Sequence, residues 1–180
     1  MTRHVALLRA INVGGKGQIR MAELRAIYEA AGARDVATYI ASGNVLFSAP
    51  AGALPAIRKK VHAELVRTLG DRAAAMYRTA AEMRAIAESD PFRRFRSKEG
   101  VGRYVLFFGA MPKIELAVPH WAESEACDVF ALRGLHAFVV SHRKKTGYYG
   151  SPNRYVEDAM GVVSTARSWS TVTKLAALCD

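Results

Sequence analysis

The chain has 180 residues, of which 51% are hydrophobic and 23% are charged. This composition excludes a disordered or fibrous chain and is typical of a folded protein with a substantial core. The charge is unusual, because 26 Lys and Arg residues against 16 Asp and Glu residues give a formal net charge of +10. Such an excess favours contact with anions, such as nucleic acid, nucleotides or acidic surfaces, and it serves solubility equally well.

Several classes of protein are excluded by what the sequence lacks. Cys127 and Cys179 have no motif spacing, so we expect neither a disulfide framework nor a zinc site. The five histidines show no metal-ligand spacing, and no metal or cofactor is expected. No apolar stretch approaches the ~20 residues of a membrane helix, and no signal-peptide pattern is present. We therefore expect a cytoplasmic protein without a membrane partner, and the oligomeric state stays open.

The first half is predicted to fold in the order βαββαβ. A buried strand at 5–11 is followed by a helix at 21–31, a hairpin of strands at 36–40 and 45–47, a helix at 54–69 and a strand at 74–77. This order is that of a ferredoxin-like unit. Thr79 and Glu82 then form a capping-box pattern, which predicts a linking helix that ends near Ser89.

The second half repeats a similar order of elements. The sequence predicts a strand at 104–108, a short helical or irregular piece at 112–118, a hairpin of strands at 128–132 and 137–141, a helix from Ser151, an edge strand at 162–163 and a last helix at 169–178. We therefore expect an α+β fold of two ferredoxin-like halves, residues 1–89 and 90–180. No repeat of individual residues supports the duplication, which is inferred from the order of elements.

A Gly-rich, basic loop follows the first strand and opens the first helix. Asn12, Gly14, Gly15 and Lys16 lie in it, and backbone N–H groups at such a loop suit an anion. The run matches neither the P-loop nor the dinucleotide fingerprint, and a flexible turn is the alternative. Ser42 and Asn44 belong either to a simple hairpin turn or to the same site, if the two segments converge.

The start of the last helix allows two interpretations. In the structural one, Ser168 caps the helix and Trp169 is a core or interface aromatic. In the functional one, Arg167, Thr171 and Lys174 contact an anion near the helix N-terminus. Residues 92–98 interleave Phe with Arg and Lys, which is typical either of a nucleic-acid contact or of a solvated basic linker.

Catalytic patterns are scarce. No Gly-x-Ser-x-Gly elbow is present, and the apolar and acidic neighbourhood of Cys127 does not suit a thiolate nucleophile. Nothing in the sequence argues for an enzyme, so whether the protein is one stays open.

Four segments resemble the bacterial family called domain of unknown function 1697. They are LRAINVGGK at 8–16, MAELR at 21–25, TYIASGNV at 38–45 and ARSWSTVTKL at 166–175. The resemblance implies two ferredoxin-like halves and no established activity. Residues 147–153, GYYGSPN, depart from the family pattern, because they lack a basic pair that members carry there; Asn153 keeps its place, and residues 143–145 could supply the charge.

The sequence thus predicts a protein that binds an anionic ligand, with nucleic acid or a nucleotide as the first hypothesis. The alternatives are an enzyme that uses the same polar cluster on a small phosphorylated substrate, and a structural or oligomeric interaction module. The candidate ligand-binding residues are Arg9, Asn12, Gly14, Gly15, Lys16, Ser42, Asn44, Asn153, Arg167, Trp169, Thr171 and Lys174.

Overall fold

The computed structural model describes residues 1–9, 11, 18–96 and 100–179. The chain forms two compact units: unit 1 comprises Met1–Ala85 and Leu175–Asp180, and unit 2 comprises the residues from Ile86 to Lys174. Both units combine helices with an antiparallel sheet, which confirms the predicted α+β class. The predicted boundary between residues 89 and 90 stays a prediction.

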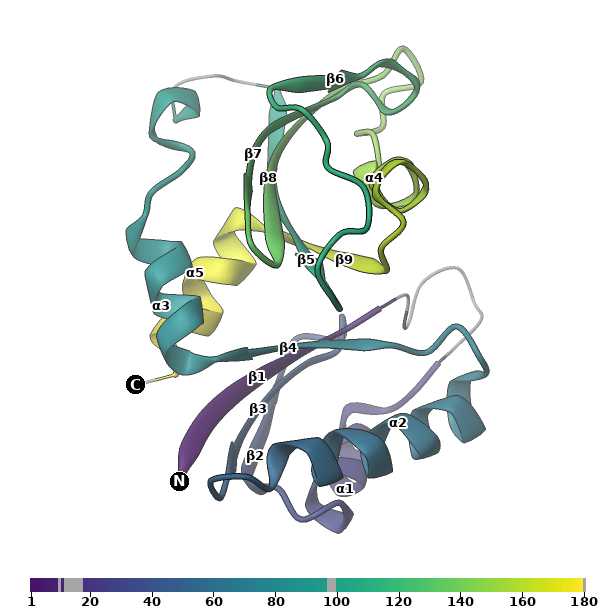
Figure 1. The fold of residues 1–180 in the computed structure, drawn as a ribbon, viewed down its shortest axis with the longest axis vertical. Coiled ribbons are helices and arrows are strands. Elements are labelled where there is room, and N and C mark those ends of the chain that lie inside the picture. Colours follow the sequence, from purple (N-terminus) through teal and green to yellow (C-terminus); the bar gives the residue numbers. More distant parts are fainter. Residues whose placement is uncertain (10, 12–17, 97–99, 180) are drawn as a thin grey trace. The chain divides into compact units, whose positions relative to one another are not determined.

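Unit 1 has the order βαββαβ, and Figure 1 shows both helices on one face of its sheet. The strands lie in the order β2-β3-β1-β4 with antiparallel neighbours, which is the ferredoxin-like arrangement. Its elements are β1 (Thr2–Leu8), α1 (Met21–Ala30), β2 (Arg34–Tyr39), β3 (Asn44–Ala49), α2 (Leu54–Leu69) and β4 (Ala75–Thr79).

The core of unit 1 lies between this sheet and the two helices. On α2, Ile57, Val61 and Leu65 recur every four residues and are buried, as the periodicity predicts. They belong to one cluster with Tyr28 of α1 and Phe47 of β3, whose ring centres lie 5.2 Å apart. The helices are therefore fixed to the sheet by apolar contacts along one stripe.

The capping box at the end of β4 is present as predicted. Glu82 accepts hydrogen bonds from the Thr79 backbone N–H at 2.7 Å and the Thr79 hydroxyl at 2.9 Å. The Glu82 backbone N–H in turn donates to Thr79 Oγ1 at 3.1 Å. These bonds satisfy N–H groups that a helix start leaves unpaired, and α3 (Ala80–Glu88) follows directly.

Unit 2 has a sheet in the order β6-β7-β8-β5-β9, again with antiparallel neighbours. Figure 1 shows α4 against one face of this sheet. Its elements are η1 (Arg93–Phe95), β5 (Val101–Phe108), β6 (His120–Ala122), η2 (Glu123–Glu125), β7 (Cys127–Arg133), β8 (His136–His142), α4 (Pro152–Met160), β9 (Ser164–Ser168) and α5 (Trp169–Ala177). The last residues of α5 belong to unit 1.

The two sheets share a strand order. In unit 2, β7-β8-β5-β9 repeats the order β2-β3-β1-β4 of unit 1, and α4 precedes β9 as α2 precedes β4. The first crossover differs, because residues 109–119 contain neither helix nor strand where unit 1 has α1. The shared order agrees with the predicted duplication.

Two predicted elements need correction, and one strand was not predicted. The prediction of an edge strand at 162–163 is wrong, because the strand, β9, spans Ser164–Ser168 and pairs with β5. The residues of β9 are largely polar. The first strand ends at Leu8 rather than at Ile11. The edge strand β6 was not predicted, because its three residues are too few to show an alternating pattern.

No helix of the described residues is both long and apolar enough to cross a membrane.

We expect Thr79→Ala to lower the free energy of unfolding by about 1 kcal/mol, because it removes a helix cap. Chemical denaturation followed by circular dichroism measures the effect. Thr79→Ser keeps the hydroxyl and should remain close to the parent protein. Equal losses for both variants would show that the cap does not contribute to stability.

Candidate functional site

The base of the first loop in unit 1 contacts the turn between β2 and β3. The Leu8 backbone N–H donates to the Gly43 carbonyl at 2.8 Å. A Cβ at Gly43 would lie 2.3 Å from Ile11 Cδ1, and the Gly43 φ of +74° also disfavours any side chain. The structure therefore brings Leu8 and Ile11, at the base of the loop, against Gly43 of the turn.

Hydrogen bonds of Asn44 stabilise the conformation of this turn. Asn44 is fully buried, and its Nδ2 donates to the Tyr39 carbonyl and to Ser42 Oγ, both at 3.0 Å. The Arg9 backbone N–H donates to the Ala74 carbonyl at 2.8 Å. Ser42 and Arg9 are half-buried beside the loop base. The predicted residues Asn12, Gly14, Gly15 and Lys16 lie outside the described residues.

Arg167 is buried in unit 2 near the end of β9. Its Nη1 donates to Thr165 Oγ1 and to the Ala166 carbonyl, both at 2.8 Å. Burial lowers the pKa of Arg167 to about 10, so the guanidinium stays charged at neutral pH. These two hydrogen bonds hold the end of the strand that leads into α5.

Hydroxyl groups cap the start of α5, as predicted for Ser168. The Thr171 backbone N–H donates to Ser168 Oγ at 3.3 Å, and the hydroxyls of Thr171 and Ser170 lie 2.9 Å and 3.1 Å from the same oxygen. Trp169 is half-buried with its ring centre 5.2 Å from that of Phe92. Lys174 lies in the last turn of α5. Asn153 is the second residue of α4, apart from this group in the chain.

A pocket of about 410 Å³ adjoins Trp169, and we call it the Trp169 pocket. Its floor crosses from the first residues of β5 to the first turn of α5. Arg103 donates from Nη2 to the carbonyls of Phe95 and Arg96, and its buried Nε has no hydrogen-bond partner in the described part of the chain. The lining residues are Gly102, Arg103, Tyr104, Ser168, Trp169, Ser170 and Thr173.

The aromatic residues of the run 92–98 pack onto the sheet. Phe92 is buried with its ring centre 5.5 Å from Phe130 and 6.0 Å from Phe138, and Phe95 lies 5.1 Å from Phe130. The Arg94 guanidinium covers the ring of Phe130 at 4.9 Å. The run is thus neither a solvated linker throughout nor a set of rings open to bases, and residues 97 and 98 lie outside the described part.

A short hairpin after β8 presents cations and aromatic rings to solvent. Arg143 forms a bridge with Tyr149, and the Lys144 N–H donates to the Tyr148 carbonyl at 2.9 Å. The Lys144 side chain points back, donating to Glu125 Oε2 at 3.1 Å and to the Ser124 carbonyl at 2.9 Å. This anchor fixes the hairpin while the side chains around it remain exposed.

Trp121 of β6 lies close to the start of this hairpin. It is 50% exposed, and its ring centre lies 5.5 Å from that of His142, the last residue of β8. Tyr148 is 79% exposed, and the Arg143 guanidinium lies 5.6 Å from the centre of the Tyr149 ring. We call the following set the hairpin surface: Trp121, Arg143, Lys145, Tyr148 and Tyr149.

The sequence reveals only part of this surface. The basic run 143–145 and the two tyrosines are close together in the chain, so the sequence shows them as one group. Trp121 lies more than twenty residues earlier, and only the pairing of β6 with β7 and of β7 with β8 brings it close.

Groups suited to covalent or metal chemistry are scarce in the described residues. No three of their His, Cys, Asp and Glu side chains lie together as a metal site would require. Burial raises the pKa of the Cys127 thiol, which lies 3.2 Å from the Glu125 carbonyl and accordingly stays protonated. This agrees with the expectation from its sequence neighbourhood.

Comparison with known proteins gives a family and a fold. A family model described as "Protein of unknown function (DUF1697)" matches residues 1–136. The solved structure of the conserved bacterial protein SP0830 from Streptococcus pneumoniae is similar to this chain, with 21% sequence identity and a TM-score of 0.69 over 99% of this chain and 98% of the other. No curated protein matches.

We expect Gly43→Ala to destabilise the protein by about 3 kcal/mol, through a left-handed backbone and a clash with Ile11. Gly52→Ala is the matched control: its φ is +77°, but nothing lies within 4 Å of the added Cβ. That variant should lose only about 1 kcal/mol. Urea denaturation compares the two, and equal losses would contradict a tight contact between the turn and the loop base.

Proposed function

The chain belongs to the DUF1697 family of proteins of unknown function, and we propose that it binds single-stranded nucleic acid on the hairpin surface of unit 2. The observation that carries the proposal is the exposure of three aromatic rings next to two cations. Unstacked bases bind to exposed aromatic faces, and phosphates bind to Arg and Lys. We also propose that the protein acts in the cytoplasm.

The charges around the hairpin support this function. Glu125 is paired with Lys144, and Asp128 lies 3.4 Å from His142. Arg143 and Lys145 make no ion pair within the described residues, so their charge is open to an incoming phosphate. With a net charge of +10 for the whole chain, association with a polyanion is favoured and should weaken with salt.

Strand register brings a second feature to the same end of the sheet. Val101 of β5 pairs with His142 on one side, and Tyr104 pairs with Ser168 on the other. The hairpin therefore continues from β8, one neighbour of β5, and the Trp169 pocket lies beside β9, the other neighbour. A strand of nucleic acid held by the hairpin has this pocket as a further contact for a base or a phosphate.

We expect a fluorescein-labelled oligonucleotide of single-stranded DNA or RNA to bind with an affinity that falls with salt. Tyr148→Ala should weaken binding by about tenfold through lost stacking, with an unchanged salt slope. Arg143→Ala should also reduce the slope of log K against log salt concentration by about 0.7. Fluorescence anisotropy at several salt concentrations measures both quantities.

Two control variants separate the surface from general charge. Tyr148→Phe keeps the ring and should bind like the parent protein. Arg154→Ala removes an exposed arginine from α4, where the side chain is 92% exposed, and should have a smaller effect than Arg143→Ala. Absence of binding at low salt, or equal effects of the two arginine variants, would contradict the proposal.

The Trp169 pocket favours a second candidate function, the binding of a nucleotide or another small phosphorylated molecule. Aromatic rings, aliphatic hydroxyl groups and the side chain of Arg103 line a volume in the range of small-molecule sites. The pocket contains no pair of groups suited to acid–base catalysis among its described lining residues, so binding rather than turnover is the proposed activity.

We expect AMP to quench the fluorescence of Trp169 if the pocket takes a nucleotide. The chain has two tryptophans, so Trp121→Phe leaves Trp169 as the sole reporter. Quenching that saturates, and that Ser170→Ala or Thr173→Ala weakens, supports the pocket. A linear, unsaturated decrease of fluorescence would contradict this second candidate.

A further inference from the structure

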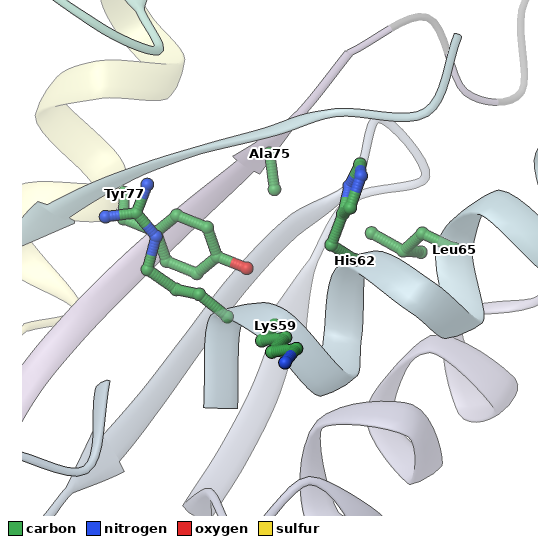
Figure 2. Close-up of a pocket in the computed structure, with 6 residues that line it drawn as sticks. Lys59, His62, Leu65, Ala75 and Tyr77 are labelled. Carbon is green, nitrogen blue, oxygen red and sulfur yellow. The ribbon is translucent and has the colours of Figure 1, made fainter. Parts of the chain in front are cut away.

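Unit 1 contains a pocket that none of the preceding functions uses. It has a volume of about 220 Å³ and lies between α2 and β4. Figure 2 shows Lys59, His62 and Leu65 on α2, with Ala75 and Tyr77 on β4 opposite. The lining residues are Arg58, Lys59, His62, Leu65, Ala75 and Tyr77.

The lining is rich in cationic groups and has no carboxylate. Arg58 and His62 are one turn apart on α2 and share a face, and Lys59 lies three residues before His62. None of the three makes an ion pair within the described residues. The positive charge of Arg58 and Lys59 is therefore not neutralised by the part of the protein that the structure describes.

The other side of α2 has the opposite character. Glu64 accepts from Arg67 at 2.8 Å, and both line a groove with Lys60 and Glu23 of α1. Carboxylates thus accompany the cations on that side. The two sides of α2 therefore differ in that carboxylates line the groove, whereas none lines the α2–β4 pocket.

Tyr77 adds a neutral donor. Its hydroxyl lies 3.5 Å from that of Tyr28, and the Arg58 guanidinium lies 4.8 Å from the centre of its ring. Burial raises the pKa of Tyr77, so the phenol keeps its proton at neutral pH. The pocket consequently offers N–H and O–H donors of four side-chain types.

The backbone of β4 borders the pocket as an edge strand. β4 pairs only with β1 among the described strands, and the Arg9 N–H donates to the Ala74 carbonyl. Because hydrogen-bonded pairs alternate along antiparallel strands, the backbone groups of Ala75 and Tyr77 face away from β1. The Arg78 Nη1 accordingly reaches the Tyr77 carbonyl at 2.7 Å.

From these observations we infer that the α2–β4 pocket binds the phosphate group of a small phosphomonoester. A phosphate is a dianion with several acceptor oxygens, and it matches a pocket lined by donor side chains from a helix and a strand. The pocket is smaller than sites that enclose a whole drug-sized ligand, so the phosphate enters it while the rest of the molecule stays outside. The inference is independent of nucleic-acid binding, since it concerns other residues in the other unit.

The test is titration of the full chain with inorganic phosphate at constant ionic strength, followed by isothermal calorimetry. We expect saturable binding, with acetate binding more weakly. Lys59→Ala should weaken phosphate binding by about tenfold, whereas Lys60→Ala, which removes the same charge from the other side of α2, should leave it within about twofold.

A second pair of variants repeats the comparison with the stronger donor. Arg58→Ala should weaken binding at least as much as Lys59→Ala, while Arg67→Ala should not, and Tyr77→Phe removes one donor without changing charge. Circular dichroism of each variant verifies the fold. Equal effects of Lys59→Ala and Lys60→Ala, equal affinities for phosphate and acetate, or no saturable binding would each overturn the inference, and none of these results depends on binding of oligonucleotides.

Discussion

β1 in unit 1 and β5 in unit 2 are inner strands that form antiparallel hydrogen bonds on both sides, and this pairing positions the described segments of the candidate sites. The pairing of β1 with β3 ends at Leu7 and Asn44, which sets Gly43 against the base of the first loop. A slip of one residue would turn each side chain to the opposite face. The same constraint acts on β5, whose first residues lie between the hairpin surface and the Trp169 pocket.

The two units share more than their strand order. Arg78 and Arg167 each occupy the penultimate position of the strand before a helix, each is buried, and each donates to the carbonyl of the preceding residue. Thr79 and Ser168 follow them and cap α3 and α5 through their hydroxyls. This correspondence of residues is what a duplication predicts, although the pairs Arg-Thr and Arg-Ser are too short to be recognised as a repeat from sequence.

Local patterns were predictable, and features that depend on distant pairing were not. The capping box of Thr79 and the tight turn at Gly43 could be predicted, because each is formed by residues that are close together in the sequence. β9 was misplaced because its side chains are mostly polar, and its burial depends on β5 and on α4 rather than on its own composition. The burial of Arg167 and its bonds to β9 are properties of the folded strand, and its role as a ligand contact stays a prediction.

The positive charge of the chain has several distinct environments, which general solubility would not require. Some cations are paired with carboxylates, as Arg67 is with Glu64 and Lys144 with Glu125. Others have no carboxylate partner in the described residues, and two of them, Arg143 and Arg58, lie in different settings. Arg143 lies beside exposed rings on an open surface, which suits the bases and phosphates of a flexible strand. Arg58 lies over a largely buried ring at a small pocket, which suits a single compact anion. The two proposed ligands therefore differ in shape, because the surroundings of each cation determine which anion can approach it.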